Sequence, residues 1–266
     1  MPRVIRAIIV AVLCFTATPV AHATERTVIS EGHVDLGPRI VDGRWTVQLR
    51  DDTGGQPVWR DLSDVVLHVA DGAATTVPDD PAYAFLGTAG TPIWVLPQVQ
   101  GDGVVWPGWN TQDPSIAEVS GREVDWRLHG VSGPGRFELF LSGNFGTPEP
   151  IFAADRPFPQ ETGIEKGTHV HGNWVFTAPG SYQLDMEMST QDGKSDRRAL
   201  RIHVGPGDPT DAFTDPAPRS AAPDPTAAPD TPDRTWIVAG AGVLLVIALL
   251  LVPALRRRKA AGKSDD

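Results

Sequence analysis

Two histidines separated by one residue, His169 and His171, are the side chains of this sequence best suited to chemistry. In an extended strand alternate side chains project from the same face, so the two imidazoles would lie side by side. Neutral imidazoles placed in this way can share one divalent metal, and zinc or manganese is the metal we expect. The spacing therefore predicts two ligands of a metal site; the alternative is a pair of structural histidines bonded to main-chain carbonyls.

At least one further ligand must come from another part of the chain. His33 and Asp35 repeat the alternate spacing, and an extended segment would present both from one face. His129, at the end of another predicted strand, is a second candidate. We therefore predict that His33, His169 and His171 hold the metal, and that either Asp35 or His129 completes the ligand set.

Two tryptophans suggest a different kind of site. Trp106 and Trp109 flank a Pro-Gly pair, and an exposed indole offers a flat apolar face that can stack on a sugar or anchor a protein partner. Packing in the core is the alternative explanation. These residues predict a glycan-binding or partner-binding site that competes with the metal hypothesis.

Catalytic signatures are poor. Ser132 stands in Gly-Val-Ser-Gly-Pro, which does not match a nucleophile elbow. The glycine-rich segments at 101–103 and 133–135 match neither phosphate-binding pattern. The single cysteine, Cys14, falls in a predicted leader, which removes thiol chemistry and disulfides from the rest of the chain. We expect no enzymatic activity.

The segments that carry these residues have a β pattern. Short alternating runs are separated by Gly, Pro and Asp, and no amphipathic helix of about ten residues is visible. The fold we expect is all-β, an immunoglobulin-like β-sandwich whose closing hairpin turns at Asp192-Gly193 and carries Tyr182 near its start. The predicted strands cover residues 45–50, 65–69, 93–96, 124–129, 137–141, 182–188 and 198–204.

Two apolar segments outside this region predict where the protein resides. Residues 1–23 have an early pair of arginines, a short apolar run and a small-x-small end, as in a signal peptide. The uncharged segment from Trp236 to Leu255 would, as a helix, cover about 30 Å of hydrocarbon. A basic tail, 256–266, follows it and by the positive-inside rule lies in the cytoplasm. We expect a single-pass cell-membrane protein with its N-terminal domain extracellular.

The predicted surface domain covers residues 24–204. Residues 205–235, rich in Pro, Ala, Asp and Thr, bury too little apolar surface to fold and are expected to form a disordered stalk. The whole chain has a formal net charge of −10. This acidity disfavours nucleic acid as a partner and favours cations.

Several segments together resemble one known family. One of them is 168–182, which contains His-Val-His-Gly-Asn-Trp-Val-Phe-Thr. By their number and order, the segments make the ectodomain similar to the actinobacterial surface-anchored protein domain, also called choice-of-anchor M. The resemblance implies a cell-surface protein with a variable C-terminal anchor, whose relatives accompany an ABC transporter of the metal-uptake type, and it supplies no catalytic residues. The other segments are 31–38, 77–83, 106–111, 129–135 and 143–146.

These observations lead to one expected function and two alternatives. The expected function is a surface accessory to a metal-uptake ABC transporter, which binds or scavenges a divalent metal or metal complex. Its expected partners are the transporter components or their substrate-binding protein, the cell envelope and the membrane. The first alternative is a non-catalytic adhesion or envelope-glycan module that uses Trp106 and Trp109. The second is a domain that docks onto the transporter's binding protein and carries no ligand of its own.

Overall fold

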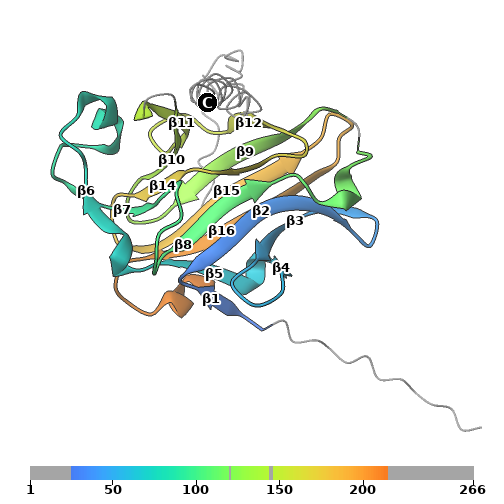
Figure 1. The fold of residues 1–266 in the computed structure, drawn as a ribbon, viewed down its shortest axis with the longest axis horizontal. Coiled ribbons are helices and arrows are strands. Elements are labelled where there is room, and N and C mark those ends of the chain that lie inside the picture. The colour runs from blue at the N-terminus through green and yellow to red at the C-terminus, as the bar shows by residue number, and fades with distance from the viewer. Residues whose placement is uncertain (1–24, 120, 144–145, 215–266) are drawn as a thin grey trace, which may run out of the picture.

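The computed structural model describes residues 25–119, 121–143 and 146–214, and in these residues the chain is almost entirely β (Figure 1). The strands form three sheets, which confirms the all-β prediction. Short 3-10 helices are the other regular elements of the described residues: η1 (Leu62–Asp64), η2 (Asp71–Ala73), η3 (Pro81–Leu86), η4 (Pro114–Ile116) and η6 (Pro209–Phe213).

The three sheets are named here A, B and C, and their strands are given in spatial order. Sheet A contains β1 (Thr27–Ile29), β5 (Val65–Val69), β16 (Ser195–Val204), β15 (Gly180–Ser189), β9 (Glu123–Ser132) and β12 (Gln160–Glu165). Sheet B contains β13 (His169–His171), β8 (Val105–Asn110), β2 (Gly32–Val41), β3 (Arg44–Asp51) and β4 (Val58–Asp61). Sheet C contains β11 (Pro148–Ala153), β10 (Phe137–Ser142), β14 (Asn173–Phe176), β7 (Pro92–Leu96) and β6 (Ala74–Thr76).

The apolar core lies where the three sheets meet. Trp109 of sheet B, Trp126 of sheet A and Trp174 of sheet C are all buried. The ring centroid of Trp126 lies 5.2 Å from that of Trp109 and 6.4 Å from that of Trp174. Because each indole buries a large apolar area, these contacts join the three sheets around one core. The core therefore fixes one face of β8, and the other face of that strand is left for different residues.

The closing hairpin of the sequence analysis is present as β15 and β16, which pair antiparallel along their whole length. Its alternation is as predicted: Leu184 and Leu200 are buried in the core, whereas Asp185 and Arg197 form an ion pair on the other face. The phenol of Tyr182, buried near the start of β15, donates to the Ala178 carbonyl at 2.8 Å. All seven predicted strands have a counterpart in the described structure.

The folded region extends beyond the predicted domain boundary at residue 204. The Gly205 amide donates to the Val69 carbonyl at 2.8 Å, and η6 buries Ala212 to 1% exposure. The Arg26 guanidinium lies 5.1 Å from the ring centroid of Phe213. Residues 205–214, assigned to the stalk from their composition, therefore belong to the domain, because a few apolar contacts suffice to hold a short segment against it.

In the described part of the chain, no helix is long and apolar enough to span a membrane. The predicted signal peptide, transmembrane segment and basic tail lie outside the described residues, as do residues 215–235 of the predicted stalk.

We expect a chain ended after Val204 to be less stable than one ended after Thr214. The shorter form loses the packing of Ala212 and Phe213 and the Gly205 hydrogen bond, which together contribute on the order of 2 kcal/mol. Urea unfolding of both forms, each begun at Glu25, measures the difference. Equal midpoints with equal slopes would show that residues 205–214 do not contribute to stability.

Candidate metal centre

The candidate centre is built on the face of sheet B that points away from the tryptophan core. Here β8 lies between β2 and β13, in parallel register with β2 and antiparallel register with β13. Gly108 of β8 is the partner of Asp35 on one side and of His171 on the other. The strand period of two then brings His33 and His169 to the same face. Four candidate ligands from two distant segments therefore surround one glycine.

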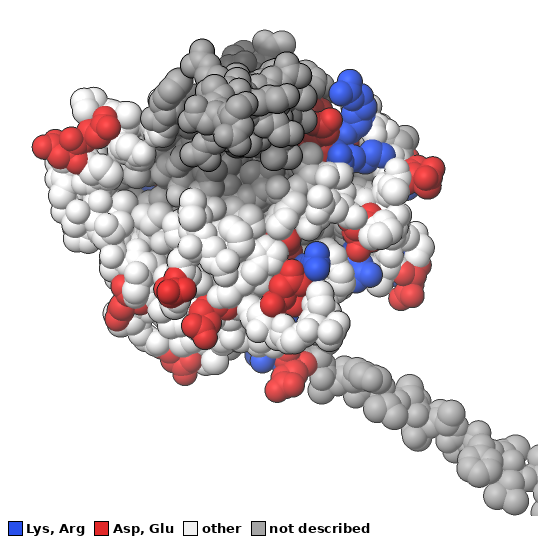
Figure 2. Space-filling model, viewed as in Figure 1, with Lys and Arg blue, Asp and Glu red and all other residues white. Residues whose placement is uncertain are grey.

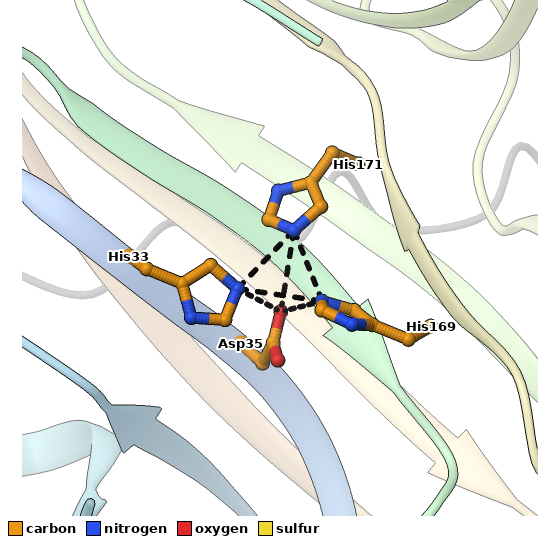
Figure 3. A group of neighbouring side chains, drawn as sticks. All are labelled: His33, Asp35, His169 and His171. Atoms are coloured by element: carbon orange, nitrogen blue, oxygen red, sulfur yellow. Dashed lines mark hydrogen bonds and ion pairs between the residues drawn. The ribbon is translucent and has the colours of Figure 1, made fainter. Parts of the chain in front are cut away.

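The four side chains converge on one point (Figure 3). Asp35 Oδ1 lies 2.9 Å from His169 Nε2, 3.4 Å from His33 Nε2 and 3.9 Å from His171 Nε2. The Nε2 atoms of His169 and His171 are 3.0 Å apart, and that of His33 lies 3.4 Å from His169 and 3.2 Å from His171. Every pair of donor atoms is thus close enough to be bridged by a single ion.

Gly108 makes this convergence possible because it has no side chain. A Cβ at this position would lie 2.5 Å from Asp35 Oδ1, 2.8 Å from His171 Cε1 and 2.9 Å from the Val170 carbonyl oxygen. Such distances are well below ordinary contact. The space above Gly108 is therefore the space in which the ligands meet.

Asp35 lies at the buried end of the cluster and has no exposed surface. Its second oxygen accepts a hydrogen bond from Asn110 Nδ2 at 3.2 Å. Burial alone would raise the pKa of Asp35, but hydrogen bonds from His169 and Asn110 outweigh burial and hold that pKa below its ordinary value. The site thus keeps an ionised carboxylate in the interior, which attracts a cation.

His33 is oriented by a carboxylate behind it. Its Nδ1 donates to Asp52 Oδ2 at 2.9 Å, and Asp52 also pairs with Arg50 at 3.0 Å. With the proton on Nδ1, the lone pair of Nε2 points into the cluster. A carboxylate that holds the far nitrogen of a ligating histidine is the usual support of a metal site.

His171 is packed against Trp106. The two rings are stacked, with centroids 3.7 Å apart and planes 11° from parallel, and the Trp106 indole is itself held by a 3.1 Å hydrogen bond to the Gln98 carbonyl. Burial lowers the pKa of His171 to about 4. Its imidazole is therefore neutral at physiological pH, which is the form that binds metals.

His169 is the most exposed of the four ligands, with 33% of its side chain accessible. It lies on β13, a three-residue strand at the edge of sheet B. The hydrogen bond to Asp35 raises the pKa of His169 above its ordinary value. The proton that this bond holds is the one that a bound cation would replace.

The donor set indicates what the cluster can do chemically. The three Nε2 atoms face one another, and neutral imidazoles carry one proton each, which for His33 is already on Nδ1. Protons can turn only some of these close contacts into hydrogen bonds, whereas one cation accepts all three lone pairs and the Asp35 oxygen together. The cluster could therefore hold a divalent metal ion. Three imidazoles and one carboxylate suit zinc and its first-row neighbours better than magnesium or calcium.

The other sequence candidates lie elsewhere or have other roles. His129, on β9 of sheet A, pairs with Glu187 at 2.6 Å and is not among the four clustered ligands. Trp109 is fully buried in the core, so it cannot stack on a sugar. Trp106 is half-buried and covers His171. The structure thus does not bring the two tryptophans together as a glycan platform. Trp106 and Trp109 are three positions apart on β8, so their side chains lie on opposite faces of the sheet.

The sequence analysis did not identify Gly108, Asn110 or Asp52 as parts of this site. Gly108 and Asn110 lie in a Pro-Gly segment that is typical of a turn, although the structure has a strand there. Asp52 could have been considered from the sequence, because it follows a predicted strand and a carboxylate there can support a ligating histidine. Its identification required the pairing of β3 with β2, which places it beside His33.

Comparison with known proteins adds no functional assignment. No family model matches this chain, no curated protein matches it and no solved structure matches it. The resemblance to the surface-anchored domain therefore stays a prediction.

Replacing Gly108 with alanine should strongly weaken metal binding while the domain stays folded. The added methyl group would crowd the Asp35 carboxylate and the His171 ring, so affinity for zinc should fall about 100-fold or more. Calorimetric titration measures the affinity, and circular dichroism in the presence of chelator checks the fold. Gly130→Ala is the matched control, because nothing lies within 4 Å of a Cβ at that strand position. Unchanged affinity in Gly108→Ala would contradict the proposed geometry.

Replacing Asp52 with alanine should weaken metal binding without removing any ligand. Loss of an outer carboxylate partner typically costs about 10- to 100-fold in affinity, and Asp52→Asn should cost less because its amide oxygen can still accept from His33. The exposed Asp79 provides the control, since Asp79→Ala changes the net charge equally at a residue outside the cluster. Equal effects of Asp52→Ala and Asp79→Ala would mean that only overall charge matters.

Proposed function

We propose that this chain is a non-catalytic surface protein that binds or scavenges a divalent metal as an accessory to a metal-uptake ABC transporter. The observation that carries the proposal is the convergence of His33, Asp35, His169 and His171 over Gly108. Three of these ligands have their own support, from Asp52, Asn110 and Trp106. Such support is typical of a site that binds an ion, and is not required of histidines that only stabilise a sheet.

Charge and chain organisation support the same proposal. The net charge is −10, and on the face seen in Figure 2 carboxylate side chains are spread widely while basic ones are few. An acidic surface raises the local concentration of cations. The predicted anchor from Trp236 to Leu255 would hold the domain at the outer side of the cell membrane, with the C-terminus cytoplasmic, where a transporter component or its binding protein is within reach.

The finer fold type forms part of the proposal. We regard the domain as immunoglobulin-like, on the evidence of the closing β15–β16 hairpin and of the Tyr182 hydrogen bond back to Ala178. In such sandwiches a tyrosine near the start of the penultimate strand bonds to the main chain a few residues upstream.

The test is metal content and affinity of the full-length protein, purified without a histidine tag. We expect about one metal per chain by elemental analysis, and titration with zinc or manganese should restore the same stoichiometry after chelation. His171→Ala should lose this binding, whereas His129→Ala, which removes an imidazole outside the cluster, should keep it. A protein that carries no metal and binds neither ion would refute the proposal and would make the cluster structural.

A further inference from the structure

Glu138 is a buried carboxyl group that lies outside the candidate metal centre. It belongs to β10 of sheet C, only 1% of its surface is exposed, and neither of its side-chain oxygens has a hydrogen-bond partner. Buried polar groups in folded proteins are nearly always hydrogen-bonded. A carboxylate ion buried without partners is especially costly, because it loses its hydration and gains nothing in return.

We infer that Glu138 is a proton-dependent stabilising residue: sheet C holds it as a neutral carboxylic acid, and the domain becomes less stable when this group ionises. The inference goes beyond the proposed metal-binding function and does not depend on it. A neutral carboxyl loses much less on burial than a carboxylate does, since no charge is removed from water. Burial without partners therefore favours the protonated form.

The neighbours of Glu138 within sheet C are apolar. Because β10 lies between β14 and β11, Glu138 is the register partner of Val175 on one side and of Ala153 on the other. Both partners are buried. Phe140, two positions further along β10, projects from the same face and packs with Val175 in one apolar cluster. None of these side chains can donate a hydrogen bond to a carboxylate.

The charged groups near Glu138 do not compensate for its burial. The guanidinium of Arg136 donates to the Leu86 carbonyl at 2.8 Å. Within the residues that the structure describes, neither Arg136 nor Arg156 is hydrogen-bonded to Glu138. Burial has the largest effect, and the negative charge of Asp155 adds to it. Together they outweigh the attraction of the two arginines and raise the pKa of Glu138 to about 7.

The raised pKa determines how the stability of the domain changes with pH. In the unfolded chain the carboxyl returns to its ordinary pKa of 4.5, so between about pH 4.5 and pH 7 the folded state binds more protons than the unfolded state. The stability that Glu138 contributes is therefore complete below this range, falls as the pH rises through it, and is constant above it. The whole change corresponds to a factor on the order of 100 in the folding equilibrium constant.

Glu138→Gln provides the test, because the amide has nearly the size of the carboxyl and does not ionise. Urea unfolding of the full-length protein, with chelator present, is measured from about pH 4.5 to about pH 8. Relative to the variant, the unchanged protein should lose on the order of 100-fold in its folding constant over this range. The other titrating groups are common to both forms, so their effects cancel. Glu118→Gln, at an exposed position, should follow the unchanged protein at every pH.

Infrared spectroscopy gives a second readout that does not require unfolding. The unchanged protein at about pH 6 should show the absorption of a protonated carboxyl group, and this absorption should disappear as the pH rises through about 7. Glu138→Gln should lack it. Parallel stability curves for the unchanged protein and Glu138→Gln, or the absence of this absorption, would overturn the inference. Both measurements are made without metal, so neither result bears on the metal-binding function.

Discussion

The position of β8 between β2 and β13 is the constraint on which the candidate site depends. Its parallel pairing with β2 and antiparallel pairing with β13 place Gly108 beside Asp35 and His171 at once. A residue with any side chain at this point would keep the two outer strands' ligands apart. Because Gly108 has no side chain, the ligands of residues 33–35 can approach those of residues 169–171.

One face of β8 packs in the core, and the other face forms part of the candidate metal site. One face carries Trp109, which packs against Trp126 in the core and thereby fixes which side of the strand faces the core. The opposite face carries Trp106, Gly108 and Asn110, each of which shapes the cluster: the first stacks on His171, the second leaves space and the third bonds to Asp35. Because alternation ties the faces together, core packing on one side sets the ligand positions on the other.

Electrostatics within the cluster follow from unequal burial. Asp35 and His171 are both deep: hydrogen bonds keep Asp35 ionised in spite of its burial, whereas burial keeps His171 neutral. His169 is exposed on a short edge strand, and His33 lies between these extremes with Asp52 behind it. The arrangement combines a fixed interior half with a more accessible outer half. Such an asymmetry is what a site needs if an ion is to be held firmly and still exchanged.

The sequence by itself determined which residues share a face: the spacing of His33 with Asp35, and of His169 with His171, follows from the strand period of two. It also identified the all-β class and seven strands with clear alternation. It could not determine which pairs meet, because register across sheets depends on packing of residues far apart in the chain. Only the tertiary structure brought Asp35 rather than His129 to the cluster, by pairing His129 with Glu187 on sheet A. It also turned Trp109 inward and made a strand of a Pro-Gly segment that resembles a turn, since the three-sheet core and the neighbouring strands supply the contacts that local pattern lacks.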